Sequence, residues 1–330
     1  MPQKSDGASG PGDTARRTLD IVFMGTPVFA RVCLAAVLST RHRVRAVVTQ
    51  PDKPSGRGMK LTESAVKKLA TERNIEVLQP KTAKDPDFLE HVRTLAPDLC
   101  VVVAYGRILP NRLIDTPALG CINAHASLLP KLRGAAPIQR AILEGDDTTG
   151  VTIMRISEEM DAGDMLLKES VAIDSDTDAA SLHDALAVVS ARLLVDSLEL
   201  LADGHAQFTP QDHGAATFAP PLRNEEARID WSRSAAEVDC HVRGFRPRPG
   251  AFTFDGGTRL KILDARPTDR AADAPPGTLL GTSGDELHVA CGDRVIVVNK
   301  VQPEGKKPMP AADYLRGRPA ALPRVLDGER

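Results

Sequence analysis

Residues 19–38 read LDIVFMGTPVFARVCLAAVL, and this stretch decides the fold of the first half of the chain. Its apolar start predicts a buried strand that ends at Gly25-Thr26-Pro27, and the apolar periodicity that follows predicts a helix to Leu38. Working outward, we predict further strands at residues 44–49, 98–104, 120–125, 151–156 and 165–173, and helices at 62–73, capped by Thr62, and 178–204. Alternating strands and helices predict a doubly wound, Rossmann-like α/β domain.

The character of the sequence changes after residue 204. Residues 205–221 are rich in Gly, Pro, Gln and Thr and resemble a linker, and a helix is predicted at 235–243. Short apolar runs separated by turn residues predict strands at 251–254, 259–263, 278–280, 287–290 and 295–301, which suggests a small OB-like β-barrel. We therefore predict a disordered tail (1–17), a catalytic domain (18–204), a linker (205–221) and an OB-like C-terminal domain (222–330).

Composition excludes several classes of protein. The chain has 330 residues and a net charge of -2, so overall charge does not indicate a nucleic-acid partner. Its five cysteines are dispersed and form no CxxC pair, which argues against a zinc or redox motif and favours a reducing cytoplasm. The apolar runs are too short for a membrane helix, and the first residues lack the apolar core of a signal peptide.

Basic residues are concentrated in one stretch of the chain, residues 41–60. Between residues 41 and 60 the only acid is Asp52, whereas six side chains are basic: Arg41, Arg43, Arg45, Lys53, Arg57 and Lys60. Such a cluster is most often a solvated surface, but it is also the kind of patch that contacts phosphates. The charge of this cluster alone does not decide between a solvated surface and a nucleic-acid contact, so the choice depends on the functional residues elsewhere in the chain.

The chemistry concentrates in Asn123-Ala124-His125 and in the loop around Asp161. Asn123 and His125 lie on one face of a strand, at the strand end where open α/β sheets bind ligands. An amide can stabilise an oxyanion, an imidazole can relay a proton, and a carboxylate can orient that ring, so the three suit acyl-type transfer. Asp164 competes with Asp161 for this role.

Other chemistries have weaker support. Gly25-Thr26-Pro27 lacks the GxGxxG pattern of dinucleotide sites, and no Walker A sequence is present. Ser127 lacks the GxSxG context of a serine nucleophile. No HxxxH-type spacing supports a metal at His125, Asp161 and Asp164.

The chain resembles the methionyl-tRNA formyltransferase family from about Leu19 to its C-terminus. Folate-dependent formyltransferases share Asn123 and His125, the Ser-Leu-Leu-Pro segment at residues 127–130, and Asp161. The basic loop and the C-terminal half favour the tRNA enzymes within that group. The matching stretches are residues 23–27 (FMGTP), 49–58 (TQPDKPSGRG), 101–110 (VVVAYGRILP), 121–139, 150–154 (GVTIM), 224–231 (NEEARIDW) and 305–307 (GKK). Met59 departs from the family, where a basic or small residue is common.

The resemblance implies formyl transfer from 10-formyltetrahydrofolate to the α-amino group of methionyl-initiator tRNA, without a metal, in translation initiation. It implies Asn123, His125 and Asp161 as catalytic residues, and Arg57, Lys53 and Lys60 as tRNA contacts. The residues that it implies for folate are Ser127, Leu128, Leu129, Pro130, Arg107, Ile108 and Leu109. Two alternatives stay open: a formyltransferase with another amine acceptor, and an inactive RNA-binding homologue.

Overall fold

The computed structural model describes residues 17–55, 60–316 and 322–327, and the chain divides into two units. The first unit comprises residues 1–122 and 194–208, and the second comprises residues 123–193 and 209–330. The boundaries fall inside strand β7 (Cys121–His125) and helix α6 (Ala179–Ala202), so both elements contribute to each unit. The predicted disordered tail lies outside the described residues, except for Arg17.

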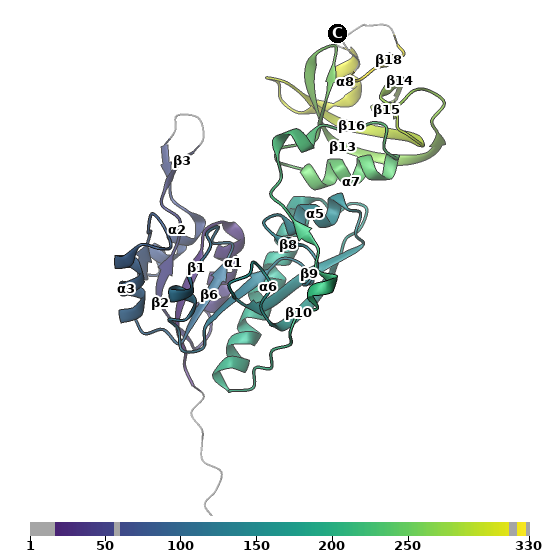
Figure 1. Ribbon diagram of the computed structural model, residues 1–330. Coiled ribbons are helices and arrows are strands. Elements are labelled where there is room, and N and C mark those ends of the chain that lie inside the picture. The colour runs from purple at the N-terminus through teal and green to yellow at the C-terminus, as the bar shows by residue number, and fades with distance from the viewer. Residues whose placement is uncertain (1–16, 56–59, 317–321, 328–330) are drawn as a thin grey trace, which may run out of the picture. The chain divides into compact units, whose positions relative to one another are not determined.

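The first unit contains a parallel sheet with the strand order β7-β6-β1-β2-β5. Strands β6, β1 and β2 of this sheet are labelled in Figure 1. β1 pairs in parallel with both β2 and β6, and Phe23 lies opposite Val47 on one side and Val101 on the other. The elements of this unit are β1 (Asp20–Gly25), α1 (Val28–Val37), β2 (Arg43–Val48), β3 (Lys53–Ser55), β4 (Lys60–Thr62), α2 (Ala65–Glu72), β5 (Glu76–Leu78), α3 (Pro86–Thr94), β6 (Leu99–Val103) and α4 (Asn111–Ile114).

Burial explains why β1 and β6 are almost wholly apolar. Every residue of β6 is buried, as are the last five residues of β1, since strands in the middle of a parallel sheet are covered on both faces. Each such Val, Leu or Ile contributes about 1.5–3 kcal/mol of transfer free energy. The chain winds from β1 towards β5 and then returns to β6, so the loops after β1 and β6 lie at a topological switch point, where sheets of this kind bind ligands.

One predicted helix boundary was wrong. Thr62 ends β4, and α2 begins three residues later with Ser64 as its N-cap. The Ser64 hydroxyl accepts a hydrogen bond from the Lys67 N–H at 3.0 Å, because a cap must stand directly before the first turn. Helix α3 was not predicted, although Pro86 at its first turn and Asp85 as its cap are ordinary start signals.

The second unit begins with the end of β7 and contains the order β10-β9-β7. β9 and β10 pair antiparallel, and the short strand β8 pairs in parallel with β11, with Gly134 opposite Ala219. The elements before the C-terminal barrel are β8 (Arg133–Gly134), α5 (Pro137–Leu143), β9 (Thr148–Arg155), β10 (Met165–Ala172), a 3-10 turn (His213–Ala215), β11 (Phe218–Ala219) and a second 3-10 turn (Asn224–Ala227).

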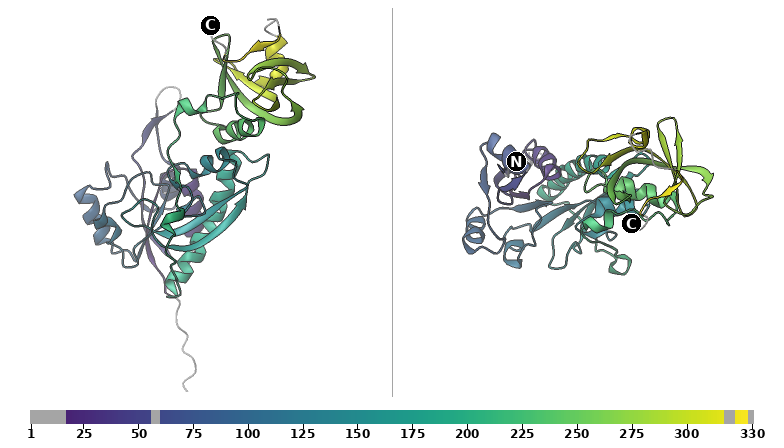
Figure 2. Two further views of the ribbon diagram at one scale, coloured as in Figure 1. Left: turned by 45° about the vertical axis from the view of Figure 1, so that its right-hand side comes forward. Right: turned by 90° about the horizontal axis from the view of Figure 1, so that it is seen from above.

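The C-terminal strands form an antiparallel sheet, in the order β12-β13-β16-β15-β14-β18, that curls into a nearly closed barrel (Figure 2). Helix α7 lies against β13 and β16, and Trp231 in the shared core donates to the Thr253 hydroxyl at 3.0 Å. The elements are α7 (Ala235–Phe245), β12 (Phe252–Asp255), β13 (Thr258–Ala271), β14 (Thr278–Ser283), β15 (Glu286–Ala290), β16 (Arg294–Pro303), β17 (Met309–Pro310), α8 (Ala311–Arg316) and β18 (Arg324–Val325).

The predicted fold class, a Rossmann-like α/β part followed by an OB-like β-barrel, is confirmed by this topology. Among the helices of the described residues, none has the length and apolar character needed to cross a membrane. Across the same residues, no three His, Cys, Asp or Glu side chains are grouped so that they could hold a metal ion.

Candidate active site

His125 is the centre of the candidate site. It is the last residue of β7, and only 6% of it is exposed. Its Nε2 atom lies 2.9 Å from the Leu132 carbonyl oxygen, and because a carbonyl only accepts, Nε2 carries a proton. Nδ1 is therefore the ring nitrogen that remains for other partners.

Asp161 provides the carboxylate beside that nitrogen. Its Oδ2 atom lies 3.6 Å from Nδ1 of His125 and accepts a hydrogen bond from the Gly134 N–H at 2.9 Å. Asp161 has φ of 52°, a left-handed conformation that Asp tolerates better than most residues. Asp164, its competitor in the sequence, is exposed, and its backbone oxygen accepts from the Arg155 N–H. The structure therefore pairs His125 with Asp161.

Asn123 lies two residues before His125 on β7 and is half-buried. Within the described residues, no hydrogen bond of its side-chain amide is found. The strand therefore presents an uncommitted donor next to the imidazole, as expected from the spacing of two.

The predicted folate segment 127–130 forms a tightly bonded loop. The Ser127 side chain is fully buried and donates to the Lys131 carbonyl at 2.6 Å, so its hydroxyl shapes the loop. Thr152 of β9 ties the loop to the sheet: its hydroxyl donates to the Ser127 carbonyl at 2.8 Å and accepts from the Leu129 N–H at 3.1 Å.

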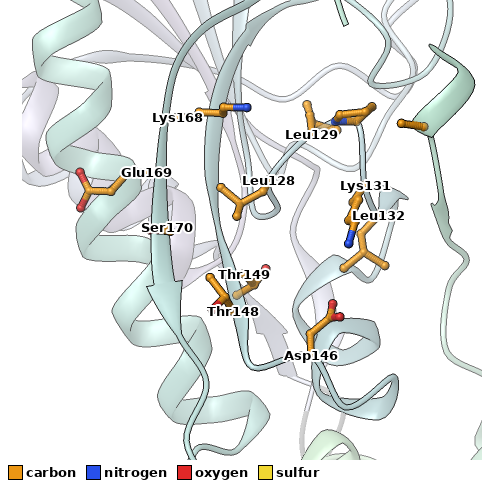
Figure 3. A pocket seen from close by; sticks show the side chains of 12 residues that line it. Leu128, Leu129, Lys131, Leu132, Asp146, Thr148, Thr149, Lys168, Glu169 and Ser170 are labelled. Atoms are coloured by element: carbon orange, nitrogen blue, oxygen red, sulfur yellow. The ribbon is translucent and has the colours of Figure 1, made fainter. Parts of the chain in front are cut away.

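A cavity of about 630 Å³ opens beside this loop. Leu128, Leu129 and Pro130 line it, and Leu132 and Asp146 face Thr148 and Thr149 of β9 across it (Figure 3). The other residues of its wall are Lys131, Lys168, Glu169, Ser170 and Ala215. Asn123, His125 and Asp161 do not line this cavity, so it is separate from the candidate acid–base group.

The other predicted folate residues belong to the first unit. Arg107, Ile108 and Leu109 follow β6 at the switch point of the sheet. Arg107 donates to the Lys81 carbonyl, Leu109 is buried, and Ile108 is 86% exposed. The Gln50 side chain supports this turn by donating to the Tyr105 carbonyl at 2.9 Å, and burial raises the pKa of Tyr105.

Two of the predicted tRNA contacts, Lys53 and Lys60, belong to strands β3 and β4, which pair antiparallel. Lys53 is exposed, with Nζ 2.7 Å from the Gln50 Oε1 atom, and Lys60 begins β4. Arg57 lies outside the described residues. At the base of the hairpin, hydrogen bonds first from Lys67 and then from Gln79 lower the pKa of Asp52, and the same contact with Asp52 raises the pKa of Lys67. Asp52, the only acidic residue between residues 41 and 60, therefore forms an ion pair with Lys67.

Sequence analysis missed two buried residues next to Asp161. Arg133 is 1% exposed and Gln211 is 5% exposed, and their side chains are hydrogen-bonded to each other at 2.8 Å. Gln211 lies within the stretch that resembles a linker. Its composition gave no signal of burial, although a buried Arg after the Ser-Leu-Leu-Pro segment needs an acceptor somewhere in the fold.

Comparisons with known proteins agree with this fold. The chain matches the family models "Formyl transferase" over residues 19–198 and "Formyl transferase, C-terminal domain" over residues 221–319. It is 46% identical to the methionyl-tRNA formyltransferase of Moorella thermoacetica, over 93% of this chain and 98% of that protein. It is 47% identical to that of Methylococcus capsulatus, over 92% and 99%.

Solved structures share the fold at low identity. An N-formyltransferase from Helicobacter canadensis, in complex with folinic acid and dTDP-3-aminofucose, matches with a TM-score of 0.66, 16% identity, and coverage of 85% of this chain and 99% of that one. HypX from Aquifex aeolicus in complex with tetrahydrofolic acid matches with a TM-score of 0.60, 19% identity, and coverage of 90% and 47%. With both family models and close relatives matched along nearly its whole length, the chain belongs to the methionyl-tRNA formyltransferase family.

Proposed function

We propose that this enzyme transfers the formyl group of 10-formyltetrahydrofolate to the α-amino group of methionyl-initiator tRNA. The observation that carries the proposal is the contact between Asp161 and His125, the last residue of β7, with Asn123 two residues earlier on the same strand. The names of the relatives support the choice of substrate. We further propose that residues 18–204 form the catalytic domain and residues 222–330 the tRNA-binding domain.

The reaction requires one nucleophilic attack and one proton relay. The amine nitrogen attacks the formyl carbon, and the carbonyl electrons move onto oxygen to give a tetrahedral intermediate. The Asn123 amide donates to that oxyanion, which contributes about 3–4 kcal/mol for a well-placed donor. Collapse reforms the carbonyl, breaks the bond from carbon to N10 and releases tetrahydrofolate. These side chains suffice for the transfer, and we propose that no metal takes part.

His125 carries the proton between the two nitrogens. The Leu132 carbonyl keeps a proton on Nε2, so the proton that moves is bound at Nδ1. Nδ1 accepts the proton that the attacking amine loses and returns it to N10 as the leaving group departs. The Asp161 carboxylate, 3.6 Å from Nδ1, lies where its negative charge attracts the positive charge that the ring carries between these steps.

The substrate contacts follow the same proposal. For the folate we assign the turn Arg107–Leu109, of which Ile108 is exposed, and the loop Ser127–Pro130, with Ser127 acting through the loop's shape. For the tRNA we assign Lys53 and Lys60 of the paired strands β3 and β4, together with Arg57, because Lys and Arg side chains bind phosphates.

The test is formyl transfer to methionyl-initiator tRNA beside methionyl-elongator tRNA, with wild-type enzyme and His125→Ala. Transfer confined to the initiator and lost in the variant supports both the substrate and the site. If wild-type enzyme binds folate yet formylates neither tRNA, the proposed acceptor is wrong. Small amines would then be tested as acceptors.

A further inference from the structure

The Gln211 side chain uses all of its hydrogen-bonding capacity. Its Nε2 atom donates to the Asp161 carbonyl at 2.9 Å and to the Gly163 carbonyl at 2.7 Å. Its Oε1 atom accepts from Arg133, from Nε at 3.1 Å and from Nη2 at 2.8 Å. Carbonyls only accept and a guanidinium only donates, so this network fixes which end of the amide faces which partner.

The Asp161 loop needs such support. A non-glycine residue in the left-handed conformation is strained, and such strain persists only where surrounding contacts hold it. Gln211 supplies two hydrogen bonds to carbonyls on either side of Ala162, so it holds the backbone that aims the Asp161 carboxylate.

The opposite end of the amide holds the partner loop. Arg133 stands between Leu132, whose carbonyl accepts from His125, and Gly134, whose N–H donates to Asp161. A fully buried guanidinium requires acceptors, and Gln211 provides two of its contacts, with His213 Nδ1 at 3.2 Å and Glu159 at 3.4 Å providing the others.

We propose that Gln211 is a positioning residue for formyl transfer. It touches neither His125 nor the reacting atoms, but it joins the loop that anchors the imidazole to the loop that carries the carboxylate. This inference rests on the proposed roles of His125 and Asp161. It also assigns a part of the active-site framework to the segment between the two family domains.

The test is Gln211→Glu, which keeps the size of the side chain and its acceptors for Arg133 but replaces the donor. A carboxylate then faces the Asp161 and Gly163 carbonyls and repels them. We expect kcat to fall about 10- to 100-fold, as misplacement of a catalytic group costs, with KM for tRNA and folate binding near wild type. Gln207→Glu is the matched control, since Gln207 is exposed four residues earlier and should leave kcat unchanged.

A second measurement separates positioning from general destabilisation. The ring ¹⁵N signals of His125 should shift in Gln211→Glu and stay unchanged in Gln207→Glu, while urea unfolding reports the stability of both variants. If Gln211→Glu does not fold, Gln211→Asn is measured by the same criteria, because its shorter amide cannot reach both loops.

The outcomes are distinct. A folded Gln211→Glu enzyme with wild-type kcat and unchanged His125 signals would overturn the positioning role while leaving the proposed function intact. If Gln211→Glu lowers both kcat and the free energy of unfolding while the His125 signals stay unchanged, Gln211 is a structural residue and not a positioning residue. If wild-type enzyme and Gln207→Glu formylate no tRNA, it is the proposed function that fails.

Discussion

The Nδ1 atom of His125 lies 3.6 Å from the Oδ2 atom of Asp161. This distance is slightly longer than a hydrogen bond, so the carboxylate supports charge on the ring without being bound to it in the resting state. The Gly134 N–H holds the same oxygen in place, so the geometry does not depend on His125 alone.

Asp161→Asn tests that relationship with little change in shape. Asn tolerates the left-handed backbone and can still accept from Gly134, so the fold should be kept while the charge is lost. We expect kcat to fall by about 100-fold or more, by analogy with carboxylates that orient a catalytic histidine. Asp164→Asn is the control, because Asp164 is exposed three residues later. Equal activity of the two variants in steady-state assays would refute the role of Asp161.

Asn123 is tested by comparing two replacements. Asn123→Ala removes the donor and should lower kcat about 10²- to 10³-fold. Asn123→Asp keeps the size of the side chain but places an anion where the oxyanion forms, so it should be at least as damaging. Single-turnover assays with both substrates saturating give this comparison. An aspartate variant that is clearly more active than the alanine variant would show that Asn123 only fills space.

The basic hairpin is tested through salt. Lys53→Ala and Arg57→Ala should weaken tRNA binding, and each should reduce the slope of log affinity against log salt by about one unit. Folate binding should not change. Lys84→Ala, an exposed cation elsewhere in the first unit, provides the control. Unaltered slopes, measured by filter binding at several salt concentrations, would remove the hairpin from the tRNA interface.

Asp178 should contribute stability that depends on pH. Burial raises its pKa, but hydrogen bonds from the Ser181 N–H and from Arg246 outweigh burial and hold it below the ordinary value. A lowered folded-state pKa means that the contribution is complete above the unfolded pKa of about 3.9 and is lost as pH falls through the folded value.

Asp178→Asn keeps an acceptor for Ser181 but loses the charge that pairs with Arg246. We expect it to lower the free energy of unfolding by about 1–2 kcal/mol near neutral pH. The difference from wild type should shrink below pH 4 or so, as the wild-type carboxyl becomes protonated. Urea unfolding across pH measures this, with the exposed Asp176→Asn as control. A difference that does not change with pH would mean that the charge contributes nothing.

Much of the fold followed from local patterns. The apolar runs of β1 and β6 are strong signals, because a strand buried on both faces needs a continuous apolar sequence. The helical spacing of the apolar residues in α6 is equally strong, because the pattern continues over a long helix. The ends of elements were predicted less well. The strand predicted at 259–263 extends to Ala271 in β13, because the second half of β13 is largely exposed and polar and has no apolar pattern. Helices α3 and α5 were missed, although each has a proline in its first turn, which is a common start signal.

The site was only partly visible in the sequence. Spacing placed Asn123 and His125 on one face of a strand, but the choice of Asp161 over Asp164 depended on the family resemblance. The contact of Asp161 with Gly134 joins residues 27 apart, and that of Gln211 with Arg133 joins residues 78 apart. No local pattern encodes such pairings, so the framework behind the catalytic group could not be predicted.

The parallel pairing of β8 with β11 sets where this enzyme can be recombined with its relatives. Gly134 has φ of 121°, and a Cβ there would lie 2.8 Å from the Ala219 backbone oxygen, so the close pairing with β11 requires glycine at position 134. A chimaera joined at residue 205 would take Gln211 and β11 from the donor of the C-terminal half and pack them against the Arg133–Gly134 segment of another enzyme. Joined after Ala219, the same exchange would keep Gln211 and β11 with the loop that they contact, so the hydrogen bonds behind His125 and Asp161 would be unchanged.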